Sequence, residues 1–356
     1  MRTPMRFHPK SRRSMAGISI VELMIAMVLG LLVLAGLASL FAGSSAARSE
    51  MERASRQIEN GRFAMEILGE DLRMAGFYGE FNVATLPVPG ALPNPCSTNI
   101  ADWQAAMPVS IQGYDNGAGF PALCLPSNIR PGTDMLVVRR AANCEAGTTN
   151  CEPLAGNRPY IQVSKCSNTT PPENVATPFV LGLQGVAPFS LRNRDCTALA
   201  GLRRYYVRVY YISNDNGAGQ PIPTLKRLET NGFAWEETPL VEGIEELNIE
   251  YGIDWSPANP DGNPDSYTTD PTTFTAAGCA TCTAPSNWSN VVTARLNLVA
   301  RNVEPSPDYV DTKRYSLGRD AGGAEIIVSP GGPYRRHAYS GVVRVVNVGQ
   351  RREKPP

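Results

Sequence analysis

The chain has 356 residues, and its 33 basic residues are balanced by 33 acidic ones. Five of the basic residues lie among the first 17 positions, which hold no acidic residue, so the remainder has 28 basic against 33 acidic residues, a net charge of −5. A chain of this length can bury one sizeable core or two modest ones. The charge balance gives no electrostatic reason to expect a nucleic-acid partner.

The first predicted element is a membrane-spanning helix over residues of about 18–42. Residues 23–42 carry no charge, and twenty residues of helix span about 30 Å, the thickness of a bilayer core. Basic residues precede this run and none follows until Arg48, which places the N-terminus on the cytoplasmic side. A cleaved secretory signal has a shorter apolar core. A plain signal anchor leaves Glu22 unexplained, because a carboxylate inside a membrane is costly without a partner.

Glu22 is explained by its spacing from Gly17 and Ile18. A basic leader ending in glycine, then an apolar residue and a glutamate four positions later, resembles the type IV prepilin signature, in which phenylalanine more often stands where this chain has Ile18. The resemblance implies that a prepilin peptidase removes residues 1–17, cutting between Gly17 and Ile18, and methylates the new amine of Ile18. Glu22 of one subunit would then neutralise the amine of a staggered neighbour, so we expect it to set the register of assembly.

The helix is expected to continue as an amphipathic stalk over residues of about 48–75. Apolar or small residues recur there in two rows with a spacing of seven, which is typical of a helix packed along one side. The rows are Met51, Ile58, Met65 and Leu72, and Ala54, Gly61, Leu68 and Ala75. Gly76 is a suitable residue to end the helix. The stripe is expected to pack on the chain's own β domain, and packing between chains stays open as the alternative.

Residues 76–356 predict a β-rich periplasmic domain with long loops. Six segments read as strands, namely 133–141, 158–165, 202–212, 245–254, 291–302 and 338–348. Leu247, Ile249 and Tyr251 alternate with Asn248 and Glu250, a pattern typical of an antiparallel sheet that is wet on one side. The predicted fold class is therefore α+β: one long N-terminal helix followed by a mainly antiparallel domain, as in pilins and pseudopilins.

Eight cysteines all lie beyond the apolar run, and their even number predicts disulfides in an oxidising compartment. Pairing between sequence neighbours is one of 105 connectivities. It would join the pairs Cys96 and Cys124, Cys144 and Cys151, Cys166 and Cys196, and Cys279 and Cys282. A single C-x-x-C and a remote His337 do not favour zinc.

No cofactor is expected, and calcium at one acidic loop is a weak alternative. Four aspartates crowd this loop, and calcium prefers such oxygen ligands. They are Asp254, Asp261, Asp265 and Asp270. Asp261, Asn263 and Asp265 match the first three EF-hand positions, but Thr272 stands where the bidentate glutamate should be. A solvated loop is the preferred interpretation.

Three further segments look like stretches of PilW-type minor pilins. These are LVEGIEELNIEYGID from Leu240, VVTARLNLVARN from Val291 and RRHAYSGVVRVVNV from Arg335. The resemblance implies a non-catalytic minor pilin that helps to start or cap a type IV pilus. It implies a single-pass protein of the bacterial inner membrane, later incorporated into the pilus. The implied partners are the prepilin peptidase and, through the N-terminal helix, other minor pilins and the major pilin.

Two alternatives stay open. One is a minor pseudopilin of a type II secretion system, and the other is a periplasmic adhesin or enzyme that uses the helix only as a tether. An enzyme is not expected, because the sequence holds no G-x-S-x-G, no H-E-x-x-H and no phosphate-binding glycine loop.

Overall fold

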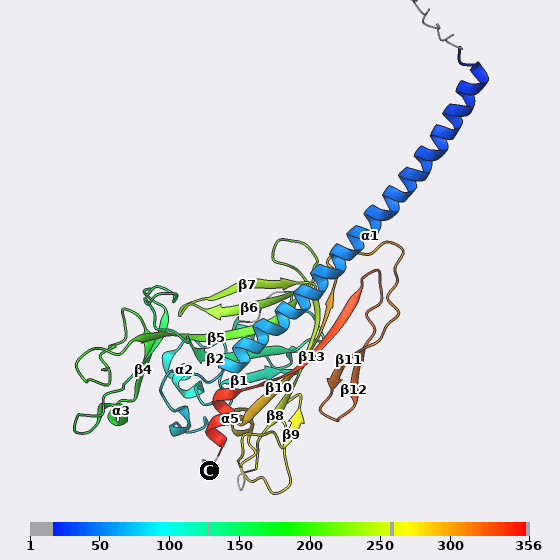
Figure 1. Ribbon diagram of the computed structural model, residues 1–356. Coiled ribbons are helices and arrows are strands. Elements are labelled where there is room, and N and C mark those ends of the chain that lie inside the picture. Colours follow the sequence, from blue (N-terminus) through cyan, green and yellow to red (C-terminus); the bar gives the residue numbers. More distant parts are fainter. Residues whose placement is uncertain (1–16, 125, 127, 257–259, 354–356) are drawn as a thin grey trace, which may run out of the picture. The chain divides into compact units, whose positions relative to one another are not determined.

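The computed structural model describes residues 17–353 apart from 125, 127 and 257–259, and the chain divides after Glu52 into two compact units (Figure 1). Helix α1 runs from Ile20 to Met74 and so contributes to both units. The remaining α-helices are α2 (Ile100–Ala106), α3 (Glu173–Ala176), α4 (Ala284–Ser289) and α5 (Val346–Arg352). The predicted fold class is confirmed: one long N-terminal helix is followed by antiparallel sheets.

The second unit is built on two main antiparallel sheets. A seven-stranded sheet has the order β1-β2-β5-β3-β4, with β6 pairing β5 and β7 pairing β6. Its strands are β1 (Ile111–Tyr114), β2 (Met135–Ala141), β3 (Pro159–Val163), β4 (Phe179–Leu183), β5 (Leu202–Ser213), β6 (Thr224–Thr230) and β7 (Trp235–Glu242). A four-stranded sheet has the order β13-β10-β8-β9. Its strands are β8 (Ile244–Ile253), β9 (Ser266–Thr268), β10 (Val291–Arg301) and β13 (Arg336–Arg344).

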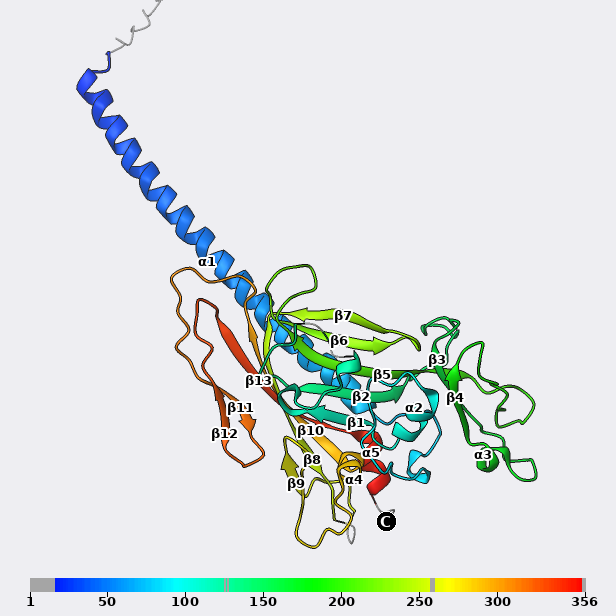
Figure 2. The same cartoon turned by 180° about the vertical axis from the view of Figure 1, so that it is seen from behind.

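All six segments predicted as strands contain one, namely β2, β3, β5, β8, β10 and β13. The last prediction extends too far, because β13 ends at Arg344 and helix α5 begins at Val346. In both views, β4 and α3 lie at one end of the second unit and the hairpin of β11 (Tyr315–Arg319) and β12 (Glu325–Val328) lies at the other (Figure 2).

The main core lies where the last turns of α1 meet one face of each sheet. Ala64, Leu68 and Leu72 of α1 are buried there together with side chains from both sheets. From the seven-stranded sheet these include Leu136, Val138, Tyr210 and Ile212, and from the four-stranded sheet Leu247, Ile249, Leu296 and Leu298. The opposite face of the seven-stranded sheet is covered by a second apolar cluster that includes Tyr78, Trp103 and Met107. Burial on both faces explains why β5 is almost continuously buried.

The two rows predicted on the stalk are buried to different extents, although Leu72, the last member of the first row, is fully buried. Gly61, Leu68 and Ala75 are buried, whereas Ile58 of the other row is 50% exposed and Met51 is 72% exposed. A straight helix of 3.6 residues per turn drifts against a spacing of seven, so the two rows cannot both face one surface along the whole stalk. Gly76, which follows the helix, has a φ of +73°, the left-handed conformation that favours glycine.

The prediction of a wet face is wrong for β8 and most of β10, whereas the same face of β13 is exposed, for example at Ser340 and Val342. Asn248 and Glu250 of β8 and Asn297 of β10 are all buried, and β8 is buried along its whole length. The β11–β12 hairpin provides part of the cover: Tyr315 and Leu317 form a small apolar cluster with Val299 of β10. Glu250 is held by a 2.7 Å ion pair with Arg295, whereas Asn248 Oδ1 and Asn297 Nδ2 have no hydrogen-bond partner among the described residues.

Strand β7 is an edge strand of the seven-stranded sheet. It pairs with β6, and four consecutive residues from Glu236 to Pro239 are exposed. Proline has no N–H to donate to a further strand, and charged side chains also discourage pairing at an edge.

Asp71 fixes the last turn of α1 to the seven-stranded sheet. Its carboxylate is buried, pairs with Arg140 of β2 at 2.7 Å and Arg208 of β5 at 2.9 Å, and accepts a hydrogen bond from the Tyr210 hydroxyl. Burial alone raises the pKa of Asp71, but Arg208 and Arg140 outweigh burial and hold the pKa below its ordinary value. The carboxylate is therefore charged at neutral pH and offsets two largely buried guanidinium groups.

Replacing Asp71 with Asn should cost about 3 to 5 kcal/mol of unfolding free energy, because both arginines lose their shared carboxylate. Urea titration of the full chain in detergent, followed by tryptophan fluorescence, measures this loss. Glu70, the exposed residue next to Asp71, provides the control. Glu70→Gln should change the free energy of unfolding by less than about 0.5 kcal/mol.

The pH dependence gives a second check on the Asp71 variant. A lowered folded-state pKa means that the stabilisation is present above the unfolded pKa of about 3.9 and is lost as the pH falls through the folded-state pKa. The difference between the natural chain and Asp71→Asn should therefore shrink below about pH 4. A constant difference from pH 7 to pH 2 would contradict the assigned charge.

Gly61 lies in α1 directly against the ring of Tyr339 in β13, where a Cβ atom would overlap the ring. Gly61→Ala must displace the ring, whose hydroxyl donates to the Ile58 carbonyl at 3.2 Å, and should cost about 1 to 3 kcal/mol. In a Tyr339→Ala background the same change should instead stabilise the chain by up to about 1 kcal/mol, because alanine favours the helix over glycine. Thermal unfolding of the four proteins measures both signs, and destabilisation in both backgrounds would contradict the overlap.

Candidate assembly helix

At the N-terminal end of α1 lie the three residues of the predicted processing and assembly signature, Gly17, Ile18 and Glu22. Gly17 and Ile18 precede the helix, and Glu22 lies in its first turn, four residues after Ile18. Ile18 is 75% exposed. The rest of the predicted leader, residues 1–16, lies outside the described residues.

The first half of α1 exposes an unusually large apolar surface. Every residue from 17 to 48 is exposed, and the large apolar side chains between Ile18 and Phe41 are 49–77% exposed. By length and composition α1 can cross a membrane. A soluble monomer rarely exposes so much continuous apolar surface, which marks a contact with lipid or with other apolar helices. The apolar N-terminal helix therefore indicates a membrane anchor.

Glu22 is the one ionisable residue between Gly17 and Ala47. Within the described part of the chain it makes no ion pair. An unpaired carboxylate in apolar surroundings costs several kcal/mol and therefore needs a cation from elsewhere. Chemically, the arrangement suits a paired charge contributed by a second chain.

Four disulfides hold the loops of the second unit, and all eight cysteines take part. They join Cys96 to Cys124, Cys144 to Cys151, Cys166 to Cys196, and Cys279 to Cys282. This is the pairing between sequence neighbours that was considered from the sequence. The disulfides act as structural links, and all but the last lie in residues 96–196.

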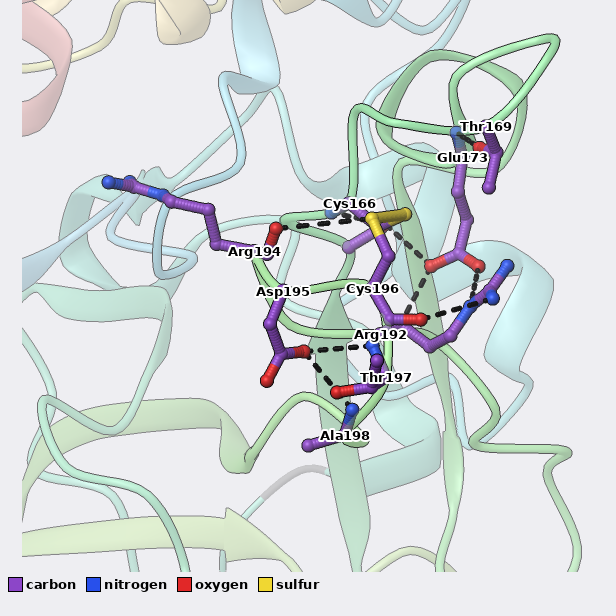
Figure 3. The surroundings of a disulfide bond; sticks show 10 residues. Cys166, Thr169, Glu173, Arg192, Arg194, Asp195, Cys196, Thr197 and Ala198 are labelled. Atoms are coloured by element: carbon purple, nitrogen blue, oxygen red, sulfur yellow. Dashed lines mark hydrogen bonds and ion pairs between the residues drawn. A yellow bond between two sulfur atoms is a disulfide. The ribbon is translucent and has the colours of Figure 1, made fainter.

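Figure 3 shows Cys166 and Cys196 beside a polar network that orders the loops after β3 and β4. Glu173 accepts hydrogen bonds from the backbone N–H of Arg192 at 2.8 Å and from its Nε at 2.9 Å. The backbone N–H of Arg192 is the main reason that the pKa of Glu173 is lowered, and the Ser164 hydroxyl acts in the same direction. The Cys166–Cys196 disulfide and the ion pair between Glu173 and Arg192 therefore connect the same two loops.

The acidic loop considered for calcium uses its aspartates for separate local contacts. Asp254 is fully buried and pairs with Arg352 of α5 at 2.8 Å. Asp265 accepts the backbone N–H groups of Trp255 and Ser256, and Asp270 accepts that of Thr272. Asp261 accepts the backbone N–H of Asn263. Across residues 17–353, with their gaps at 125, 127 and 257–259, no three acidic, His or Cys side chains gather in a way that could hold a metal.

His337 lies exposed on β13, with its ring edge against Tyr339 at 4.7 Å between centroids. An arginine-lined cavity between residues 53–60 of α1 and the end of β10 is a feature that the sequence analysis missed. Its residues lie about 240 positions apart in the sequence, and no local motif links them.

The disulfides should differ in their contribution to stability. Cys166 and Cys196 are 30 residues apart and Cys279 and Cys282 only three, and in the chain-entropy model a longer closed loop gives the greater stabilisation. Replacing the first pair with serine should cost about 3.5 kcal/mol and replacing the second about 2 kcal/mol. Urea titration of the full chain in detergent tests this order, with the second pair as the matched control. A larger loss for the second pair would contradict it.

Residues 209–347 match the model of a family described as type IV pilus-assembly protein W, PilW. The matched segment runs from β5 to the first residues of α5 and contains most of the three segments on which the resemblance was based. It also includes Cys279 and Cys282.

No curated protein matches the chain. Among solved structures, the type IV-like pilin TTHA1219 from Thermus thermophilus is similar with 13% sequence identity and a TM-score of 0.33, over 82% of this chain and 97% of that chain. The family match covers less than half of the chain, and together with the long N-terminal helix it makes the chain similar to PilW-type pilins.

Proposed function

We propose that the protein is a non-catalytic minor pilin that takes part in starting or capping type IV pilus assembly. In this proposal the prepilin peptidase cuts between Gly17 and Ile18, and the new amine of Ile18 is methylated. The protein waits in the bacterial inner membrane as a single-pass subunit with residues 76–356 in the periplasm. It then joins other minor pilins and the major pilin through α1.

The observation that carries the proposal is the single carboxylate of Glu22 within an exposed apolar helix segment. A tether needs no charge at that position, and lipid penalises one. An assembling helix can use it, because a neighbour's N-terminal amine supplies the missing cation. Two costly charges then neutralise each other in the correct stagger only, so a wrong register is penalised.

The free energy of an ion pair between Glu22 and a neighbour's N-terminal amine is large enough to control assembly. Removing one member of a buried ion pair typically costs about 3 to 5 kcal/mol, which corresponds to more than about two orders of magnitude in an association constant. Apolar packing of the same helices tolerates sliding, whereas a charge pair does not. Glu22 therefore supplies specificity, and the surrounding leucines, isoleucines and valines supply the bulk of the contact.

Periplasmic exposure of residues 76–356 is supported by the disulfides. Four pairs use every cysteine of the chain, and such links persist in an oxidising compartment and are rare in a reducing one. The charge distribution agrees, because the five basic residues before Gly17 favour the cytoplasmic side for the N-terminus.

Intact mass and N-terminal sequencing of the protein from membranes of a cell with its cognate peptidase test the processing step. The expected N-terminus is Ile18 carrying one methyl group. An intact leader would contradict the proposal and favour a helix-anchored periplasmic protein.

Glu22→Ala tests the assembly step in the same cells. The variant should still be cleaved and inserted in the membrane, but its amount in sheared pili, measured by immunoblot, should fall at least about tenfold, since tenfold corresponds to only about 1.4 kcal/mol. Glu70→Ala, which removes an exposed carboxylate near the other end of α1, is the control and should be incorporated normally. Normal incorporation of Glu22→Ala would contradict a register role.

A further inference from the structure

A small polar cavity opens in the second unit beside residues 53–60 of α1. It has a volume of about 150 Å³. Arg53, Arg56 and Asn60 line it from α1, Arg301 from the end of β10, and Glu242 and Glu304 from the neighbouring loops and strand. Since a water molecule occupies about 30 Å³ in the liquid, the cavity can hold a small polar group of a few atoms.

Arg301 is the unusual member of this set. Its side chain is only 7% exposed, its guanidinium lies 3.7 Å from the centroid of the Tyr334 ring, and its buried Nε has no hydrogen-bond acceptor. Within the described ranges of the chain, no carboxylate pairs with it. The nearby Arg336 is by contrast paired with both Glu245 and Asp311. A buried guanidinium without an anion is costly, so Arg301 has an unmet need for an acceptor.

The two carboxylates at the cavity already have partners. Glu304 pairs with Arg53 at 3.0 Å, and Glu242 accepts a hydrogen bond from Asn216 at 2.9 Å. Three arginines against two carboxylates leave the cavity with a charge of +1. One carboxylate would neutralise this charge, and a doubly charged phosphate would leave an excess of negative charge.

We propose that this arginine cavity binds the side-chain carboxylate of an Asp or Glu on a neighbouring pilus subunit. Arg301 would donate from its free N–H groups to the incoming oxygens, while Tyr334 holds the guanidinium plane. Arg56, an exposed residue at the cavity, would complete the second cationic contact. The inference rests on the proposed function, because it takes the occupant from an adjacent subunit packed along α1.

The binding chemistry can be tested with acetate as the probe, on the full chain in detergent micelles. In protein labelled with ¹⁵N-arginine, the Nε–H signal of Arg301 is identified by its loss in Arg301→Lys. Added sodium acetate, at ionic strength held constant with sodium chloride, should move this signal along a saturating curve and leave that of the exposed Arg194 on a shallow straight line. A linear or absent response at Arg301 would overturn the proposal.

Assembly in cells tests the partner. Arg301→Gln and Arg56→Glu should each lower the amount of the protein in sheared pili at least tenfold, and Arg301→Lys should retain part of it. Arg56 is exposed, so Arg56→Glu cannot fail merely because a buried group was lost. Arg194→Glu reverses the charge of another exposed arginine, away from the cavity, and should have no effect.

Glu22→Ala in the same experiment separates the two proposals. If Glu22→Ala is lost from pili while Arg301→Gln and Arg56→Glu are incorporated normally, the proposed function stands and the cavity inference is overturned. If Glu22→Ala is incorporated normally, the proposed function fails and the subunit partner fails with it. Loss of all three variants, with saturating acetate binding, supports both.

Discussion

The buried carboxylate of Asp71 is the contact on which the second unit depends. It joins the last turn of α1 to β2 and β5 of the seven-stranded sheet, and the apolar residues preceding it can then fill the space between that sheet and the four-stranded one. Charge and packing thus fix the same helix turn in two independent ways. The first half of α1 has no such contacts, and its surface is left entirely to lipid or to other chains.

Pairing of buried charges also explains how polar side chains of β8 and β10 can be buried in the four-stranded sheet. Glu250, Asn248 and Asn297 would normally face water, but the β11–β12 hairpin and ion pairs such as Arg295–Glu250 cover them. Buried polar groups are tolerated where partners are provided, and they specify one arrangement of the strands. Among the described residues, a few buried atoms lack such a partner, including Asn248 Oδ1, Asn297 Nδ2 and Arg301 Nε. Arg301 is a charged group that no carboxylate in this part of the chain pairs, and this is the basis for assigning it an external partner.

Local features of the fold were predictable from the sequence, and long-range ones were not. The uncharged run, the glutamate at position 22 and the alternating strands are patterns within about twenty residues, and the structure has a helix and strands there. The pairing of neighbouring cysteines was one of many connectivities, and the structure contains that one. The cover over the four-stranded sheet and the arginine cavity each bring together residues far apart in sequence, and no periodicity reports such contacts. Cleavage after Gly17 remains a prediction, since it concerns chemistry on residues largely outside the described ones.

The exposed edge of β7 has a consequence for a protein held in a membrane. Anchoring confines copies to two dimensions and raises their local concentration, and under these conditions an open strand edge readily adds the strand of another copy. Pro239 has no N–H to offer, and the neighbouring Glu236 and Glu237 would repel the same residues of a second chain. The β7 edge is therefore poorly suited to add a strand from another copy, even where membrane anchoring brings copies close together.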